Sequence, residues 1–148
     1  MPGWLRSLHL PGGKQEKGSS KAVDGDKKER QMNKRKLGAS YEDIACHYLE
    51  GQGLRILERN YRICQGEVDI IAWEENVLVF FEVKYRKNRL YGEPAEAVSF
   101  LKQKKISKVA RQYCYVRRMD KQVRFDVISI CAEEITWYKD AFPYRGDD

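Results

Sequence analysis

A carboxylate and an ammonium lie two residues apart in one of the most apolar stretches of the chain. Glu82 and Lys84 belong to the run Val-Phe-Phe-Glu-Val-Lys at residues 79–84. On a β-strand, side chains two residues apart point to the same face. Burying both charges costs free energy unless they pair with each other or bind a ligand. The pair therefore indicates either an internal ion pair at a strand end or a functional site.

Asp69 adds a second carboxylate if the segments on either side of Glu75-Asn76 form a hairpin. A two-residue turn there places Asp69 opposite Glu82, and Glu67 opposite Lys84, so that each pair shares a face. A four-residue loop gives the same register, whereas a three-residue loop shifts it. Facing carboxylates repel each other, and oxygen ligands beside a lysine suit Mg²⁺ or Mn²⁺. This register therefore predicts a metal site.

Two more charged residues lie within or beside the apolar stripes of expected helices. Lys102 lies four residues from both Val98 and Ile106, inside an apolar stripe that should face the sheet. A lysine there either extends to the rim or meets an anion, such as an acidic site or a phosphate. Glu42 borders the apolar stripe of the first expected helix, where it is either solvated or leans over the edge of the sheet.

The elements that must position these residues are visible as periodic apolar patterns. A helix is expected from about Leu37 until Gly51, and a longer one from Pro94 to about Val116. Strands are expected at residues 54–63, 68–73, 77–85 and 123–131, with 135–138 as a candidate fifth. This order predicts an α/β fold with a central mixed β-sheet flanked by helices.

Composition divides the 148 residues into one domain and two tails. Residues 1–36 hold ten basic and four acidic residues, whereas the other residues hold eighteen of each, so the excess charge of +6 belongs to the N-terminal segment. We interpret 1–36 as a flexible basic tail, 37–140 as the folded domain and 141–148 as a C-terminal tail. The charge of the first tail favours non-specific attachment to nucleic acid.

Charge is also unevenly distributed within the domain. Eight basic residues and one acid lie between Lys102 and Lys121, while the acids gather between residues 42 and 82. Such polarity suits the guidance of a phosphate backbone toward a metal centre, although a solvated helix face explains the basic run almost as well.

Several classes of protein are excluded. No apolar run is long enough for a membrane-spanning helix. The four cysteines lack the spacing of a zinc or redox motif, so they are expected to be core residues in a reducing cytoplasm. A Ser-His-Asp or Cys-His system lacks its base, because His47 is the one histidine of the expected domain. No glycine-rich loop is available to bind phosphate.

Asp69 followed by Glu82-Val83-Lys84 resembles the D…E-x-K core of the PD-(D/E)xK nuclease superfamily. A wider set of segments, in the same order, is similar to the uncharacterised YraN family, which itself is similar to archaeal Holliday junction resolvases. This similarity covers about residues 37–131. The segments are Arg59-Asn60-Tyr61-Arg62, Gly66-Glu67-Val68-Asp69, Phe80-Phe81-Glu82-Val83-Lys84-Tyr85-Arg86, Gly92-Glu93-Pro94-Ala95-Glu96-Ala97-Val98, Lys102 and Arg124-Phe125-Asp126-Val127.

The resemblance implies a restriction-endonuclease-like fold, a bacterial cytoplasmic setting and a DNA substrate. It implies a Mg²⁺-dependent endodeoxyribonuclease and favours a homodimer, since junction resolvases act as dimers. Two positions depart from the pattern: Tyr41 stands where the family usually has Gly, and Val68 stands where the superfamily has Pro. A non-catalytic nucleic-acid-binding module that keeps the fold stays open as the alternative.

The resemblance also implies a role for each site residue. The metal, Mg²⁺ or Mn²⁺, would be held by two carboxylates and one carbonyl, a lysine would act on water and phosphate, and two polar groups would come from the helices. The two carboxylates are those of Asp69 and Glu82, and the carbonyl is that of Val83. The catalytic lysine is Lys84, and the two polar groups from the helices are Glu42 and Lys102.

Limited trypsin digestion is expected to remove residues 1–36 and to leave a resistant core. The reason is the change of composition near Leu37, beyond which apolar residues recur at helical spacing. Mass spectrometry of the fragments over time locates the boundary. Early cleavage throughout residues 40–130 would contradict it.

Overall fold

The computed structural model describes residues 24–87 and 98–146. The chain divides into two compact units, Met1–Leu37 and Gly38–Asp148. Helix α1 (Asp24–Gly51) contributes residues to both. No helix within the described ranges is long and apolar enough to cross a membrane.

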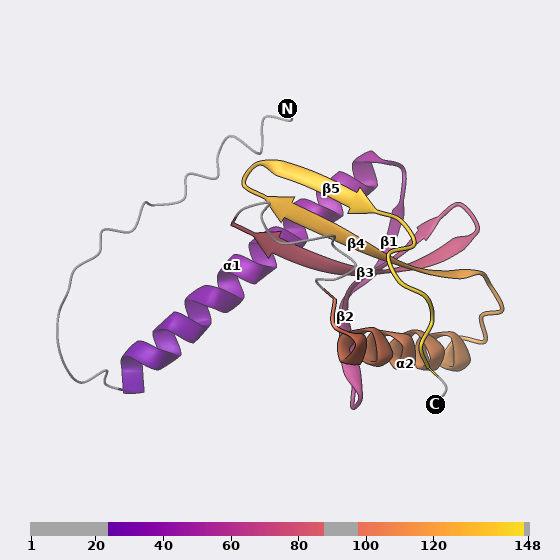
Figure 1. Cartoon of the computed structure of the whole chain (residues 1–148), viewed down its shortest axis with the longest axis horizontal. Helices are drawn as coiled ribbons and strands as arrows, with labels where there is room; N and C mark the ends of the chain where they lie inside the picture. The colour runs from indigo at the N-terminus through magenta and orange to yellow at the C-terminus, as the bar shows by residue number, and fades with distance from the viewer. Residues whose placement is uncertain (1–23, 88–97, 147–148) are drawn as a thin grey trace. The chain divides into compact units, whose positions relative to one another are not determined.

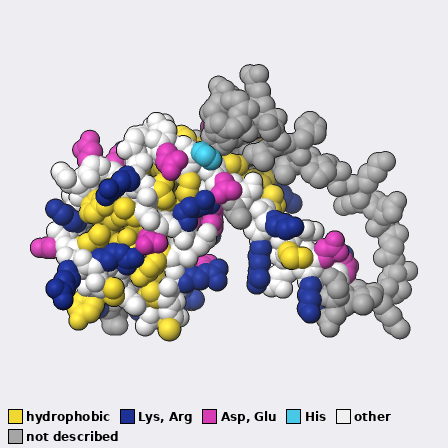
Figure 2. All heavy atoms as spheres, turned by 180° about the vertical axis from the view of Figure 1, so that it is seen from behind, with side chains coloured by type: hydrophobic (Ala, Val, Ile, Leu, Met, Phe, Trp, Pro, Cys, Tyr) yellow, Lys and Arg dark blue, Asp and Glu magenta, His cyan; other side chains and the backbone are white. Residues whose placement is uncertain are grey.

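The described part of the first unit is helical, so the prediction of a flexible tail is wrong for residues 24–36. Residues 26–37 are all exposed, and Figure 2 shows Lys and Arg side chains along this stretch. Composition excluded burial but not helix formation, because Lys, Arg, Glu, Gln and Met are good helix formers. Arg30 also pairs with Asp26, one turn earlier, at 3.2 Å. Residues 1–23 lie outside the described residues.

The second unit is built on a five-stranded mixed sheet with strand order β1-β2-β3-β4-β5 (Figure 1). β3 and β4 are parallel and are connected through α2 (Phe100–Val116), whereas the other neighbours are antiparallel. The predicted α/β fold with a central mixed sheet is confirmed, and it is consistent with a restriction-endonuclease-like fold. The strands are β1 (Arg55–Ile63), β2 (Gly66–Glu74), β3 (Val77–Arg86), β4 (Val123–Cys131) and β5 (Glu134–Tyr138).

The hairpin of β2 and β3 has the predicted register over its first half. Glu74 pairs with Val77 and the ladder continues to Ile70 and Phe81. The β2–β3 ladder ends there, so neither Asp69 with Glu82 nor Glu67 with Lys84 forms a ladder pair as expected. Glu67 instead pairs with Arg62 of β1, both in register and through an ion pair of 2.8 Å.

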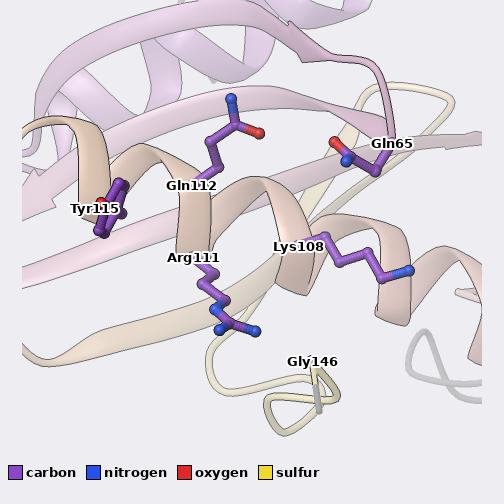
Figure 3. A pocket seen from close by; sticks show the side chains of 6 residues that line it. All are labelled: Gln65, Lys108, Arg111, Gln112, Tyr115 and Gly146. Atoms are coloured by element: carbon purple, nitrogen blue, oxygen red, sulfur yellow. The ribbon is translucent and has the colours of Figure 1, made fainter. Parts of the chain in front are cut away.

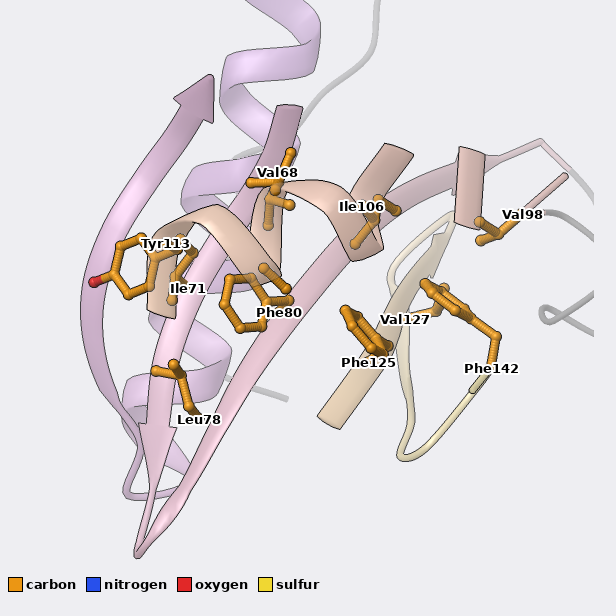
Figure 4. Close-up of a cluster of buried hydrophobic side chains, with 12 residues drawn as sticks. Val68, Ile71, Leu78, Phe80, Val98, Ile106, Tyr113, Phe125, Val127 and Phe142 are labelled. Carbon is orange, nitrogen blue, oxygen red and sulfur yellow. The ribbon is translucent and has the colours of Figure 1, made fainter. Parts of the chain in front are cut away.

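Both faces of the sheet are covered within the second unit. On one face Phe80 of β3 packs against Tyr113 of α2 and Phe125 of β4, with ring centroids 5.8 and 6.0 Å apart, in the cluster shown in Figure 4. Phe81 points to the opposite face, since neighbouring strand residues alternate. There it lies 6.0 Å from Trp137, which in turn meets Tyr48 of α1 at 6.5 Å.

Helix α2 starts later than the sequence predicts. Pro94 lies outside the described residues, but Val98 and Ser99 are not helical, and Ser99 is the N-cap before Phe100. The Oγ atom of Ser99 accepts a hydrogen bond from the backbone N–H of Lys102 at 3.2 Å. Pro94 was a misleading signal because proline favours helix starts but does not require one.

The C-terminal segment is not a tail in its described part, residues 141–146. Phe142 is buried in the same core cluster as Phe125, and their rings stack at 5.2 Å. The backbone N–H of Arg145 donates a hydrogen bond to Ser107 Oγ at 3.0 Å. The assignment of 141–148 as a tail is therefore corrected for these residues, whose aromatic side chains bury apolar area against the sheet.

A buried carboxylate, Asp126, joins β4, β5 and the segment after β5. It is completely buried and accepts hydrogen bonds from both Nε and one Nη of Arg124 at 2.8 Å, from Trp137 Nε1 at 2.9 Å and from the Asp140 N–H at 2.9 Å. Arg124 also donates a hydrogen bond to Glu74 of β2. The hydrogen bonds to Asp126 and, to a smaller extent, to Glu74 raise the pKa of Arg124. A buried charge with this many donors is stabilised by its own structure.

Replacing this carboxylate is expected to destabilise the fold strongly. Asp126→Ala strands Arg124 and leaves two N–H donors unsatisfied, so we expect a loss of about 3–5 kcal/mol in the free energy of unfolding. Urea denaturation measures the loss. Asp43→Ala is the matched control, because Asp43 pairs with Arg59 at the surface and should cost less than about 1 kcal/mol. Equal losses in the two variants would contradict this account.

Candidate active site

A cluster of charged side chains lies where the β2–β3 ladder ends. Glu82 and Lys84 come from β3 and Lys102 from the first turn of α2. Lys84 Nζ is 3.2 Å from Glu82 Oε1, and Lys102 Nζ is 3.8 Å from Glu82 Oε2. The structure thus brings Lys102 to the predicted carboxylate instead of leaving it in bulk solvent.

Glu82 is the centre of the cluster, and its hydrogen bonding is incomplete. The residue is 5% exposed. Its Oε2 atom is buried and has no hydrogen-bond partner among the described residues, since Lys102 Nζ is beyond hydrogen-bond distance. An unsatisfied buried acceptor costs free energy and calls for an explanation. The contrast with Asp126, which has four hydrogen bonds on the opposite face of the sheet, marks Glu82 as the carboxylate that can accept a ligand.

Asp69 lies beside Glu82, as the hairpin register predicts. Its Oδ2 accepts a hydrogen bond from the backbone N–H of Val83 at 2.8 Å. This side-chain bond takes up a backbone donor of β3 beyond the last ladder pair, Ile70 and Phe81. The contact therefore uses the N–H of Val83, and the role of its carbonyl as a metal ligand stays a prediction.

Both carboxyls have a raised pKa, chiefly because they are buried. Burial is the main cause that raises the pKa of Glu82 to about 7, and the charge of Asp69 adds to it, while Lys102 and Lys84 oppose it. Burial likewise raises the pKa of Asp69 to about 6, opposed by the Val83 N–H and reinforced by the charge of Glu42. In the absence of a cation the pair therefore keeps protons to a higher pH than ordinary carboxyls do, and perturbed carboxyls of this kind are typical of functional sites.

Capping positions Lys102. The Oγ atom of Ser99 accepts a hydrogen bond from the backbone N–H of Lys102, and this bond fixes the first turn of α2 over the end of β3. A lysine at a helix N-terminus is opposed by the helix dipole. That unfavourable placement is offset by Glu82. Together, the helix N-terminus and the two lysines create a positively charged environment that suits a phosphate group.

Glu42 approaches the cluster from α1. It is half-buried, and its charge acts on Asp69. Its neighbour Tyr41 stacks on Tyr85 of β3, with ring centroids 4.2 Å apart and planes at 14°. Burial and a hydrogen bond with Tyr85 raise the pKa of Tyr41 to about 12. This stack ties the helix that carries Glu42 to the strand that carries Lys84.

The donors present fit a hard divalent cation. Among the residues that the structure describes, no three His, Cys, Asp or Glu side chains group closely enough to form a complete protein cage. Mg²⁺ does not need one, because it is commonly bound by one or two carboxylates together with water and substrate phosphate. The unsatisfied Oε2 of Glu82 and the neighbouring Asp69 carboxylate offer oxygen ligands of this type.

The sequence reasoning missed two contributors to the site. Ser99 is one, although Ser followed by a helical apolar pattern is a known start signal. Tyr85 is the other, and its contact with Tyr41 has no local signal because the two residues are 44 positions apart. All five residues predicted to act through their side chains, namely Glu42, Asp69, Glu82, Lys84 and Lys102, lie in or beside the cluster.

Comparison with known proteins gives one consistent result. The profile of "Uncharacterised protein family UPF0102" matches residues 41–130. A UPF0102 protein of Lachnoclostridium phytofermentans is 45% identical over 117 residues, which cover 78% of this chain and 99% of the relative. One of Alkaliphilus oremlandii is 47% identical over 102 residues, covering 67% and 86%. One of Vibrio parahaemolyticus is 41% identical over 114 residues, covering 74% and 94%. The matched region contains every residue of the cluster.

The metal-free protein is expected to lose stability as the pH rises from about 4 to about 7. The folded pKa of Glu82 lies above its ordinary value of 4.5, so the folded state keeps a proton that the unfolded chain releases. The stabilisation is complete below about pH 4 and is lost as the pH passes the folded pKa. Urea denaturation in EDTA at several pH values measures this.

Glu82→Gln should flatten the curve and raise the stability at pH 8. Glu67→Gln is the matched control, since this half-buried carboxylate on the neighbouring strand β2 pairs with Arg62. It should keep the wild-type pH dependence. Parallel curves for wild type and Glu82→Gln would show that Glu82 does not titrate as described.

Proposed function

We propose that this chain, which belongs to the uncharacterised protein family UPF0102 and through it to the restriction-endonuclease-like superfamily, is a metal-dependent nuclease that hydrolyses phosphodiester bonds in DNA. The observation that carries the proposal is the buried, unsatisfied Glu82 carboxylate with Asp69 beside it and a lysine on either side. A site with two carboxylates for a cation and two ammonium groups for a phosphate suits this reaction.

Asp69 and Glu82 would hold Mg²⁺ or Mn²⁺, with the Val83 carbonyl as a further ligand. The bound metal supplies Lewis-acid stabilisation of the charge that develops on the phosphate in the transition state. Glu42 acts on Asp69 electrostatically and would hold a water molecule or a second cation. Ionisation of the pair, which burial opposes, becomes favourable once positive charge is present.

The lysines act on water and phosphate. Lys84 contacts Glu82, and its side chain is 35% exposed, so it can reach a water molecule, orient it for attack on phosphorus and stabilise the phosphate charge. Lys102, whose side chain is 29% exposed, contributes a second positive charge from the capped start of α2. Attack of the water oxygen on phosphorus would break the bond to one sugar oxygen, while the water gives a proton to solvent and the leaving sugar oxygen takes one up. The two ammonium groups would stabilise the negative charge of the transition state.

The proposed substrate comes from the resemblance to junction resolvases, and the proposed cellular location is supported by the cysteines. Like the junction resolvases that the sequence resembles, the protein would act on branched or junction DNA as a homodimer. The four cysteines are free thiols, which fits a cytoplasmic location. The exposed basic stretch of α1 would add non-specific attachment to the DNA backbone.

One observation favours a second candidate, a nucleic-acid-binding module without catalysis. Both lysines already contact Glu82, so the cluster could serve as an internal ion-pair network. In that case the carboxylates would bind no cation, and the cluster would stabilise the fold alone.

Two variants distinguish the candidates. For a nuclease, Asp69→Asn and Lys84→Ala should each lower Mg²⁺- or Mn²⁺-dependent cleavage by about 10²–10³-fold or more. Asp69→Asn should keep or raise the metal-free thermal midpoint, because it relieves repulsion with Glu82. Cleavage is measured on duplex, single-stranded and branched DNA, metal binding by calorimetry, and stability by thermal unfolding.

Glu67→Gln and Lys121→Ala are the matched controls, since they change the same kinds of charge outside the cluster, at a half-buried and an exposed position respectively. They should leave cleavage unchanged. For a binding module the pattern reverses: Lys84→Ala lowers stability by up to about 3 kcal/mol with no activity to lose. A wild-type protein that binds neither metal at millimolar concentration would rule out the nuclease.

A further inference from the structure

A second polar site lies on α2, away from the cluster. It is a hollow of about 490 Å³, a volume within the usual range of small-ligand sites. Two cations, two amides and one aromatic ring are among the described residues that line it, and none of these residues is acidic. They are Gln65, Lys108, Arg111, Gln112, Tyr115 and Gly146 (Figure 3).

The walls of this hollow are held by specific contacts. Gln65 belongs to the turn before β2, and the next residue, Gly66, approaches α2 closely. A Cβ atom at position 66 would lie 3.0 Å from Lys105 Cβ and 3.3 Å from the Lys105 carbonyl oxygen. The C-terminal segment is joined to α2 through Arg145, whose Nε donates to Gln103 Oε1 at 2.7 Å. These contacts hold the walls of the hollow in place within the second unit.

The residues from α2 form one stripe. Positions 108, 111, 112 and 115 follow the spacing that places side chains on one side of a helix. The sheet-facing side is formed by other residues, among them Ile106, Val109 and Tyr113, which are buried. Tyr115 is 83% exposed, so it contributes little to the core. It lines the same hollow as the two cations.

We propose that this hollow binds a single-stranded segment of nucleic acid, with phosphates at Lys108 and Arg111 and a base stacked on Tyr115. Lysine and arginine neutralise phosphates, and an exposed aromatic ring is the usual stacking surface for an unpaired base. The amides of Gln65 and Gln112 provide donors and acceptors for base edges. The absence of carboxylates from the described lining removes the repulsion that a phosphate would meet.

The position of the hollow relative to the cluster selects the form of the strand. Arg111 follows Lys102 by nine residues, about two and a half turns, so the two side chains leave α2 on opposite sides. A strand that reaches both must change direction around the helix. Duplex DNA is stiff over about 150 base pairs, whereas a single strand bends easily. The inference thus rests on the proposed function and narrows its substrate to DNA with a single-stranded arm.

Binding is tested in EDTA, where metal-dependent cleavage does not interfere. The probe is a fluorescent single-stranded DNA of about 12 nucleotides, within the site sizes of single-strand-binding proteins, with the RNA and duplex of the same sequence for comparison. Tyr115→Ala should weaken binding of the single strand by about five- to a hundredfold, and Tyr115→Phe should retain it. Lys108→Gln and Arg111→Gln should each reduce the salt dependence of log K by about 0.7.

Lys121→Gln is the matched control, because it removes one exposed charge outside the hollow. It should leave the binding of the single strand within twofold of wild type. Cross-linking of 5-iodouracil in the probe should label Tyr115, as mapped by mass spectrometry. Binding of the hollow variants equal to wild type, equal competition by polyglutamate, or stronger binding of duplex would each overturn the inference.

The two proposals fail in different ways. If wild type cleaves no DNA but Tyr115→Ala loses binding in EDTA, the hollow stands and the hydrolysis does not. If Asp69→Asn abolishes cleavage while the hollow variants bind and cleave a single-stranded arm normally, the nuclease stands and the hollow does not. Thermal midpoints equal to wild type establish that each variant is folded.

Discussion

The burial of Glu82 in an apolar strand is the constraint on which the site depends. A carboxylate at this depth must be protonated, paired or bound to a cation. The chain meets the first two demands only in part, because Lys84 and Lys102 approach from two elements while Oε2 keeps no hydrogen bond among the described residues. Asp126, on the other face, shows that the same sheet can satisfy a buried carboxylate completely when its role is structural.

Much of the fold and of the cluster could be predicted because the signals are local. Alternating apolar residues identify the strands, and the short turn at Glu75-Asn76 fixes the register that brings Asp69 to Glu82. Lys102 could be found because a charge inside an apolar helical stripe breaks the pattern. What these residues share is that one element, or one hairpin, is enough to infer their direction.

The misses have the opposite cause. Nothing near Asp126 in the sequence separates it from Glu82, since both lie in apolar strands and only their distant partners differ. The burial of Phe142 and the stack of Tyr41 on Tyr85 likewise depend on residues far along the chain. The helix of residues 24–36 was missed for another reason: the composition argument concerned burial, whereas an exposed helix depends on backbone propensity and neighbouring charges.

The close approach of Gly66 to Lys105 has an evolutionary consequence. One wall of the hollow and the lysine that faces Glu82 are both carried by α2, and the distance of this helix from the β1–β2 turn is limited by a missing methyl group. A side chain at position 66 would require the helix or the turn to shift by a few tenths of an ångström, and such a shift would act on both regions. Selection at this position is therefore pleiotropic: neither region can adapt through it without changing the other.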